Sequence, residues 1–330
     1  MFIMTKSVVC FISSFLLSIS IGFILIPFLK KIKMKQTLSI YLERSHQSKK
    51  GTPTMGGLIF IISSLVTVII LFIFKKIDYS LNFLIIIITF TLYALVGLID
   101  DLLIVIYKNN KGLTESQKLI LQIIIATLFF YLFMKADNEP LLWIHTLNLK
   151  YNIGFIYGIF ILFILISTSN AVNLTDGLDG LAGGLSLIVF VSLGIISYYA
   201  SWLEGYREIS LFCFIISGSI LGFLLFNVNP AKVFMGDTGS LSLGALMGSI
   251  AILTRHEILL IILMFVFVLE TLSVILQRYY YKLTKKRLFP MAPIHHSFEK
   301  KGFDERDIVK IFWTVGLIFS LISIIFGVII

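Results

Sequence analysis

Residues 81–101 read LNFLIIIITFTLYALVGLIDD, a long apolar run that ends in two adjacent carboxylates, Asp100 and Asp101. A helix rises about 1.5 Å per residue, so this run can cross the roughly 30 Å hydrocarbon core of a bilayer once. A membrane β-strand would need only about ten residues and would alternate apolar with polar side chains. The stretch therefore predicts a transmembrane helix that carries acidic groups at one end.

The rest of the chain has the same apolar character. Of its 330 residues, 58% are hydrophobic and only 14% are charged, and the mean hydropathy is +0.99. In soluble domains about a quarter of the residues are charged, so this chain has too few charges to cover a water-facing surface. We expect an all-α integral membrane protein in which residues 1–330 form a single polytopic domain within the lipid bilayer.

Ten apolar segments are long enough to span a bilayer, so we expect about ten transmembrane helices. Their expected ranges are 7–29, 55–74, 81–99, 117–134, 151–172, 181–203, 209–228, 233–253, 257–281 and 308–330. The gaps between these segments are too short to hold a separate soluble domain.

The basic residues set the expected orientation. Of the 27 Lys and Arg residues, 19 lie in or beside the loops that follow odd-numbered spans, whereas 7 lie at the N-terminus or beside the loops that follow even-numbered spans. Loops rich in Lys and Arg stay on the cytoplasmic side. We therefore expect cytoplasmic odd loops and two extracytoplasmic termini. Topology accounts for the net charge of +9, and we expect no nucleic-acid partner.

The polar residues that break the apolar pattern fall on the odd-numbered loops. Asp100 and Asp101 end the third span, where the helix dipole makes two anions unfavourable unless a cation offsets them. Asp176 and Asp179 follow the fifth span at i,i+3 spacing, which would place them on one face if the segment were helical. Asp237 opens the eighth span. We therefore expect the active site on the cytoplasmic face.

These five aspartates have almost no basic residue beside them, which favours a hard divalent cation. Mg²⁺ prefers carboxylate, water and phosphate oxygens, and the N-termini of the sixth and eighth spans offer free amides to an anion. The cytoplasmic donors able to hold a diphosphate are Lys49, Lys50, Lys118, His295 and His296. The alternative is that each aspartate is a helix cap or a solvated loop residue.

Two polar features have two interpretations each. The basic run 281–287 suits anchoring to anionic headgroups as well as substrate binding. Glu270 lies in the middle of the ninth span, where an ionisable group is costly and must face protein or water. It is either a structural hydrogen-bonding group or a functional one.

Five motifs in order resemble one family of membrane transferases. They are GTPTMGG at 51–57, DD at 100–101, NAVNLTDGLDG at 170–180, FMGDTGS at 234–240 and APIHHSFE at 292–299. Together with the ten-span plan they resemble the bacterial phospho-N-acetylmuramoyl-pentapeptide transferases, a branch of the polyprenyl-phosphate N-acetylhexosamine-1-phosphate transferase superfamily. The first and last motifs are similar to this branch rather than to those that use UDP-N-acetylglucosamine.

The resemblance implies a reaction and a location. Phospho-N-acetylmuramoyl-pentapeptide would pass from UDP-N-acetylmuramoyl-pentapeptide to undecaprenyl phosphate, giving lipid I and UMP in the first membrane step of peptidoglycan synthesis. It also implies Mg²⁺ as cofactor and a multi-pass protein of the bacterial inner (cytoplasmic) membrane with cytoplasmic catalytic loops. A homodimer is one candidate assembly.

The resemblance further implies roles for individual residues. Asp237 would be the principal Mg²⁺ ligand, with Asp100, Asp101 and Asp176 as further candidates. The implied catalytic residues are Asp100, Asp101, Asp237, His295 and His296; the implied substrate-binding residues are Lys49, Lys118, Asn173, Asp176, Asp179, Asn227 and Phe234. Asp100 is proposed in the family as the base that deprotonates the lipid phosphate, but a phosphate dianion has no proton to lose. Ser297 stands where the family usually has a third histidine.

Two other functions share some of these features. A UDP-N-acetylglucosamine phosphotransferase of the same superfamily would carry related motifs. A secondary transporter or cation channel would place its acidic residues near the bilayer midplane, whereas here they lie on loops of one side. For the transferase itself, direct displacement and an aspartyl intermediate both fit the residues.

Overall fold

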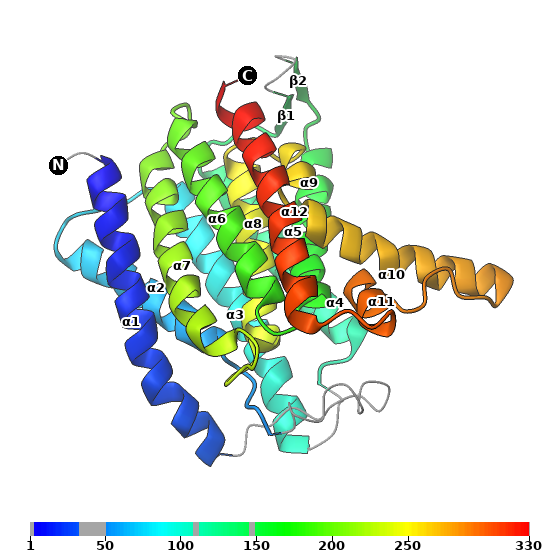
Figure 1. Cartoon of the computed structure of the whole chain (residues 1–330). Coiled ribbons are helices and arrows are strands. Elements are labelled where there is room, and N and C mark those ends of the chain that lie inside the picture. Colours follow the sequence, from blue (N-terminus) through cyan, green and yellow to red (C-terminus); the bar gives the residue numbers. More distant parts are fainter. Residues whose placement is uncertain (1–2, 33–50, 108–111, 145–148, 330) are drawn as a thin grey trace.

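The computed structural model describes residues 3–32, 51–107, 112–144 and 149–329. These residues form a bundle of long helices packed side by side (Figure 1). Within this part of the chain, seven helices are long and apolar enough to cross a membrane, and α2 is a shorter apolar helix. The prediction of a helical integral membrane protein is thereby confirmed.

The elements follow one another in a simple order. The helices are α1 (Ile3–Lys31), α2 (Gly57–Ile73), α3 (Leu81–Tyr107), α4 (Glu115–Lys135), α5 (Ile156–Thr175), α6 (Leu181–Tyr199), α7 (Tyr206–Asn227), α8 (Gly236–Leu253), α9 (Leu259–Leu263), α10 (Phe265–Thr284), α11 (Ile294–Lys300) and α12 (Glu305–Ile324), which ends in a π-helical turn (Ile325–Ile329). The strands are β1 (Leu141–Ile144) and β2 (Leu149–Asn152), paired antiparallel.

Helix α8 lies inside the bundle and contacts α2, α3, α5 and α6. Every residue of α8 from Thr238 to Leu253 is buried. Glycine, alanine and serine make up half of this helix, and such small residues let neighbouring backbones approach closely within a membrane. Because α8 is surrounded by protein rather than lipid, it does not need the strongly apolar surface of the outer helices.

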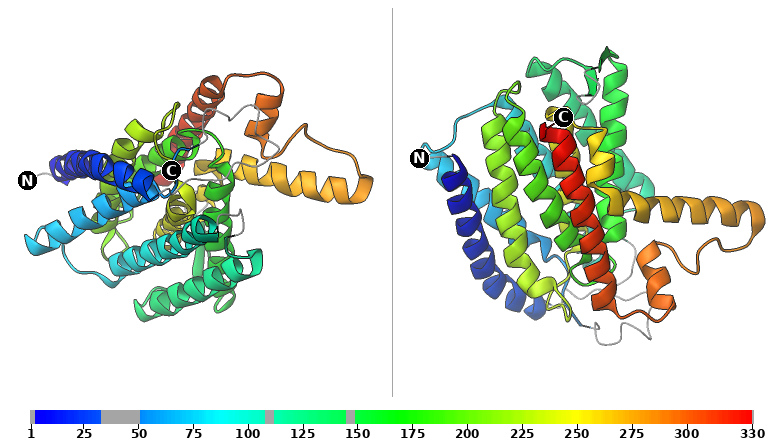
Figure 2. Two further views of the ribbon diagram at one scale, coloured as in Figure 1. Left: turned by 90° about the horizontal axis from the view of Figure 1, so that it is seen from below. Right: turned by 45° about the horizontal axis from the view of Figure 1, so that its top comes forward.

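The bundle has two distinct ends. Both termini lie near the same end, and α12 runs towards it from α11 at the other end (Figures 1 and 2). Helices α6 and α12 run in parallel, since Trp313 of α12 donates to the carbonyl of Leu181 at the start of α6 and Ser320, further along α12, hydrogen-bonds to Ser192, further along α6. The starts of α6 and α12 therefore lie at the end away from the termini.

A small β-hairpin replaces the expected start of the fifth span. Residues 151 and 152, expected to be helical, belong to β2, and α5 begins only at Ile156. Between the two elements Gly154 has a φ of +55°, a conformation that glycine adopts without strain. The start predicted at residue 151 was wrong because Tyr151 and Ile153 prolong the apolar run beyond the helix.

The expected ninth span, 257–281, is not one continuous helix. It is divided at Met264, whose ψ of 25° departs from helical geometry, into α9 and α10. Helix α10 then projects sideways from the bundle (Figures 1 and 2). Directly after the break, Phe265 stacks on Phe319 of α12 with ring centroids 3.8 Å apart. Hydropathy reports the length of an apolar run but not its direction, so the bend was not predicted.

A buried polar cluster follows α8 at the end that carries the termini. Arg255 donates hydrogen bonds to the carbonyls of Glu139 and Leu141 and to the hydroxyl of Tyr157. Tyr157 in turn donates to the buried carboxylate of Glu257. These bonds tie the turn after α8 to the segment around β1 and to α5.

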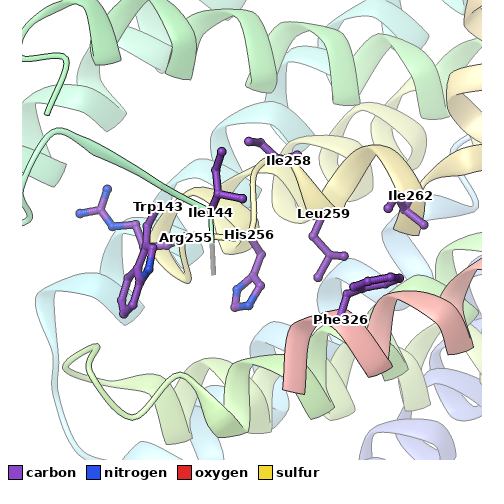
Figure 3. Close-up of a pocket in the computed structure, with 8 residues that line it drawn as sticks. All are labelled: Trp143, Ile144, Arg255, His256, Ile258, Leu259, Ile262 and Phe326. Atoms are coloured by element: carbon purple, nitrogen blue, oxygen red, sulfur yellow. The ribbon is translucent and has the colours of Figure 1, made fainter. Parts of the chain in front are cut away.

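A pocket of about 190 Å³ opens beside this cluster (Figure 3). It is lined by Trp143, Ile144, Arg255, His256, Ile258, Leu259, Ile262 and Phe326. The 18 residues of α8 separate it from the start of that helix, a rise of about 27 Å at 1.5 Å per residue. The pocket is therefore distinct from the polar residues at the other end.

Gly97 makes a close contact between α3 and α8 that can be tested. A Cβ at this position would lie 2.1 Å from the backbone oxygen of Asp237, which cannot move unless α8 shifts. We expect Gly97→Ala to destabilise the protein by about 1–3 kcal/mol, the usual cost of overpacking, and to lower its thermal unfolding midpoint in detergent. Gly194→Ala is the control, because its Cβ would lie 3.0 Å from the ring of Phe214 and 3.2 Å from the Cβ of Cys213, which are much looser contacts than the one at Gly97. Equal midpoints for the two variants would contradict the close contact.

Candidate active site

The start of α8 is capped by a carboxylate from the neighbouring helix α3. The buried Asp101 accepts the Thr238 N–H at 3.0 Å and the Thr238 hydroxyl at 2.6 Å with Oδ2, and the Asp237 N–H at 3.3 Å with Oδ1. The first amides of a helix have no acceptor within the helix, and the helix dipole favours a negative charge beside them. Asp101 therefore satisfies the amides of α8, and they offset the cost of burying its charge.

The segment before α2 holds the same turn from another side. Three backbone hydrogen bonds of 2.7–2.9 Å join residues 53–57 to residues 234–235. A Cβ on Gly57 would lie 2.4 Å from the Cα of Gly239, so only a residue without a side chain fits there. The GTPTMGG and FMGDTGS motifs thus form one structural unit that fixes the position of Asp237.

Asp237 connects three helices through its carboxylate. Its Oδ2 lies 2.5 Å from the Lys118 ammonium of α4, and its Oδ1 accepts the side-chain amide of Asn173 on α5 at 2.8 Å. Lys118 also lies 3.3 Å from Oδ2 of Asp100, whose Oδ1 accepts the N–H of Leu113 at 2.7 Å. The Lys118 and Asp237 side chains are 20% and 24% exposed, so a ligand can reach both.

This donor set fits a hard cation that binds together with a substrate. Asp100 and Asp237 already converge on one cation, the ammonium group of Lys118. Mg²⁺ is usually held by one or two carboxylates and completes its shell with water and phosphate oxygens. In the described part of the chain, no three His, Cys, Asp or Glu side chains are arranged to hold a metal. A divalent ion held by Asp100 and Asp237 would therefore need water or phosphate oxygens to complete its coordination shell.

The segment between α5 and α6 is a turn rather than a helix. Residues 176–180 have no helical hydrogen-bond pattern, and Gly180 has a φ of +82°, which disfavours any other residue. Asp176 and Asp179 therefore do not share a helical face. A shared face was predicted only for the case that this segment is helical, and the glycines of the segment prevent a helix there.

Asp179 belongs to a separate network of hydrogen bonds. Its Oδ2 accepts the N–H of Ala231 at 3.0 Å and the amide of Asn229 at 3.2 Å. Its own N–H donates to Glu305 at the start of α12, 2.7 Å away. These bonds join the α5–α6 turn to the α7–α8 segment and to α12.

Asn227 makes a similar connection. Its side-chain oxygen accepts the N–H of Gly180 at 3.1 Å, and its amide donates to the carbonyl of Val233 at 3.0 Å. Asn227 is buried, and both polar atoms of its side chain hydrogen-bond to the backbone. Phe234 is half-buried. Their contact with substrate stays a prediction.

The two histidines lie on the short helix α11. His295 is fully buried, and its Nε2 lies against Gly177, where an added Cβ would be only 2.3 Å away. His296 is nearly buried, with Nδ1 2.6 Å from a carboxylate oxygen of Glu299. The two imidazole centroids are 4.2 Å apart. His295 thus packs against the same turn that carries Asp176 and Asp179.

Ser297 closes the loop in front of α11. Its hydroxyl donates to the carbonyl of Met291 and accepts the N–H of the same residue at 3.2 Å. Where the family usually has a third imidazole, this chain therefore has a hydroxyl engaged with its own loop.

The structure joins five of the predicted residues directly. Hydrogen bonds or ion pairs connect Asp100, Asp101, Lys118, Asn173 and Asp237. Lys49 and Lys50 lie outside the described residues.

Sequence reasoning missed other residues of this region. The cap partner Thr238 stood within a quoted motif, but nothing in the sequence showed which carboxylate it would meet. Glu305 gave no signal at all, because its partner Asp179 lies far away along the chain.

The fold and the site define an integral membrane protein with an ion-paired cluster of two carboxylates and a lysine at one end of its helical bundle. A family model described as glycosyl transferase family 4 matches residues 83–255. The phospho-N-acetylmuramoyl-pentapeptide-transferase signature 1 matches residues 49–61, which include the segment that holds the start of α8.

Several relatives carry the name phospho-N-acetylmuramoyl-pentapeptide-transferase. The Staphylococcus epidermidis protein (strain RP62A) is 49% identical over 308 residues, covering 92% of this chain and 94% of the relative. The Staphylococcus carnosus protein is 46% identical over 320 residues, covering 96% and 98%. A Geobacillus protein is 43% identical over 320 residues, covering 96% of each. The chain belongs to the phospho-N-acetylmuramoyl-pentapeptide-transferase family, and the resemblance noted in its motifs is confirmed.

The two adjacent aspartates are expected to differ in their effect on stability. Asp101→Ala leaves buried donors at the start of α8 without an acceptor, a loss of about 1–3 kcal/mol. Asp100→Ala costs less, because its partner Lys118 reaches water. Thermal unfolding midpoints of the two purified variants test this difference. An Asp101 variant as stable as the Asp100 variant would argue against the cap.

Proposed function

We propose that this chain transfers phospho-N-acetylmuramoyl-pentapeptide from its UDP conjugate to undecaprenyl phosphate, forming lipid I and releasing UMP. The observation that carries the proposal is the ion-paired cluster of Asp100, Lys118 and Asp237 at the capped start of α8. The names of the relatives support it, as does the match to the family signature.

The reaction needs charge neutralisation and in-line positioning more than covalent help from the protein. A phosphate oxygen of the lipid forms a bond to the phosphorus that bears the sugar. The anhydride bond to the uridine side breaks, and its electron pair leaves on the UMP phosphate. Negative charge is present on both sides of the reacting phosphorus, so a cluster that collects cations is the feature required.

Lys118 suits the diphosphate. An ammonium group has three protons to donate, and its two carboxylate contacts leave a third for a phosphate oxygen. Both oxygens of Asp100 are already engaged, one by Lys118 and one by the N–H of Leu113. We therefore assign Asp100 to holding the cations of the site rather than to removing a proton from the lipid phosphate.

We further propose that Asp237 and Asp100 are the carboxylates that hold Mg²⁺. When bound, Mg²⁺ would neutralise the diphosphate and make UMP a better leaving group. Asn173 orients Asp237 by donating to its Oδ1. The Asp101 carboxylate is committed to the amides of α8, so we assign it to positioning Asp237, while Asp176 stays a candidate ligand.

We also assign roles to the remaining predicted residues. We assign His295 and His296 to the sugar and phosphate side, and Lys49, Asp179 and Phe234 to the uridine side. In that role the Asp179 carboxylate would contact the uridine while its Oδ2 still accepts hydrogen bonds from the Asn229 amide and the N–H of Ala231.

The site is proposed to face the cytoplasm of a bacterial cell from the inner membrane. The seven long apolar helices, α2, α8 and the α9–α10 pair would make ten crossings. Both termini at one end of the bundle support an even number of crossings (Figure 1). The excess of Lys and Arg on the odd loops supports a cytoplasmic position for the other end. A homodimer stays a prediction.

The reaction can be tested by UMP release. We expect the purified protein to release UMP from UDP-N-acetylmuramoyl-pentapeptide when undecaprenyl phosphate and Mg²⁺ are present, and to stop when the metal is chelated until Mg²⁺ is restored. UDP-N-acetylglucosamine is the control donor and should give no product. Turnover of that donor alone would instead favour the sister branch of the superfamily.

Asp237→Ala should abolish turnover without unfolding the protein. Removing a single hydrogen-bond donor that stabilises a transition state typically costs on the order of 10²–10³ in kcat, and we expect the loss of the carboxylate that gathers the cations to cost at least as much. The side chain is partly exposed, so its removal should leave the fold intact. The measurements are kcat for UMP release and the thermal midpoint of the same preparation. Lys135→Ala, at the far end of α4, serves as the control and should keep full activity. Normal turnover of the Asp237 variant would refute the site.

A further inference from the structure

Glu270 of α10 is a fully buried carboxylate that lies next to His295, one of the predicted site residues. Its Oε2 accepts the N–H of Ile294 at 2.7 Å and that of His295 at 3.4 Å. The same oxygen lies 3.2 Å from Nδ1 of the His295 imidazole, an ion-pair distance without hydrogen-bond geometry. Oε1 and both imidazole nitrogens have no hydrogen-bond partner among the described residues. One oxygen thus meets both the backbone and the side chain of His295.

This contact constrains the protonation of the imidazole. In a neutral imidazole one ring nitrogen carries the proton and the other is an acceptor with a lone pair. A carboxylate oxygen close to one nitrogen repels a lone pair there and attracts a proton, so its charge favours protonation of that nitrogen. With Glu270 beside Nδ1, the Nε2 of His295 is left as the unprotonated nitrogen. That nitrogen lies against Gly177, in the turn that carries Asp176 and Asp179.

We propose that Glu270 is a positioning residue of the transferase, which acts by holding His295 in its Nδ1–H form and seating it against the turn of residues 176–180. The inference rests on the proposed function. It connects α10, which leaves the bundle sideways, to the substrate-facing turn through one imidazole. It also gives Glu270, in the middle of the ninth apolar segment, a functional role rather than a purely structural one.

A purely structural role would look different. If Glu270 served only to cap α11, any acceptor at its position would suffice, and Gln would replace it because its amide oxygen can still accept the N–H of Ile294. Gln cannot supply the negative charge that holds a proton on Nδ1. Glu270→Gln therefore separates a capping role from a role that acts through His295.

The first test is the tautomer of His295 in the wild-type protein. Protein labelled with ¹⁵N-histidine and placed in lipid bilayers is examined by solid-state NMR, with the His295 signals assigned by their absence in His295→Asn. We expect a protonated Nδ1 and an unprotonated Nε2 in the wild type, and loss of this preference in Glu270→Gln. A protonated Nε2 in the wild type would overturn the proposal, even if no Glu270 variant could be purified.

The second test is a double-mutant comparison of kcat for UMP release. We expect Glu270→Gln to lower kcat by about tenfold in the wild-type background, within the range of directly coupled residues, and by less than about twofold in His295→Asn. Equal reductions in both backgrounds, or none in the wild type, would overturn the proposal. A wild-type protein that releases no UMP would instead refute the proposed function, and the tautomer would still be measured.

Glu257→Gln provides the matched control. Glu257 is also a buried carboxylate hydrogen-bonded to a neighbour, Tyr157, but it lies at the opposite end of the bundle. Its substitution should leave kcat and the His295 tautomer unchanged. A reduction as large as that of Glu270→Gln would show that neutralising any buried carboxylate disturbs the enzyme, and would overturn the specific role.

Discussion

The contact between α3 and α8 is the constraint on which the reacting end of this protein depends. α3 brings a glycine that admits the backbone of α8 and, one turn later, the carboxylate that caps it. Each feature needs the other: without the close approach Asp101 could not reach the amides of Thr238 and Asp237, and without those amides its charge would be costly to bury. The neighbouring Asp100 is carried along and meets Lys118 on the open side. Two adjacent, chemically identical side chains thus acquire different tasks from their surroundings.

Much of this architecture could be predicted from the sequence, and the reasons are physical. Lipid demands long apolar helices, so the spans were readable from the lengths of apolar runs. The same demand confines charged side chains to the ends, so the positions of Asp100, Asp237 and His295 were informative before any contact was known. The recognised motifs then indicated the family. Apart from the family motifs, the predictable features are those that the membrane environment imposes on the chain.

The parts that could not be predicted depend on contacts between distant segments. The bend at Met264 leaves no mark on hydropathy, because both halves of the segment are apolar. The role of Asp101 as a cap, rather than as one of several equivalent acidic groups, follows only from which amides it meets. The separate network of Asp179 depends on Glu305, at the start of another helix. A sequence shows which groups are available but not which acceptor is nearest.

The backbone pairing between residues 53–57 and 234–235 changes what the family signature means. A diagnostic stretch is commonly assumed to record chemistry, yet here its glycines and carbonyls serve to hold another loop in place. Gly57 is restricted by the Cα of Gly239, irrespective of which sugar nucleotide the enzyme uses. Such a signature records a shared way of assembling a site. The signature can therefore mark this branch through the way its site is assembled, and the side chains that select the sugar nucleotide have to be sought among those that contact the ligand.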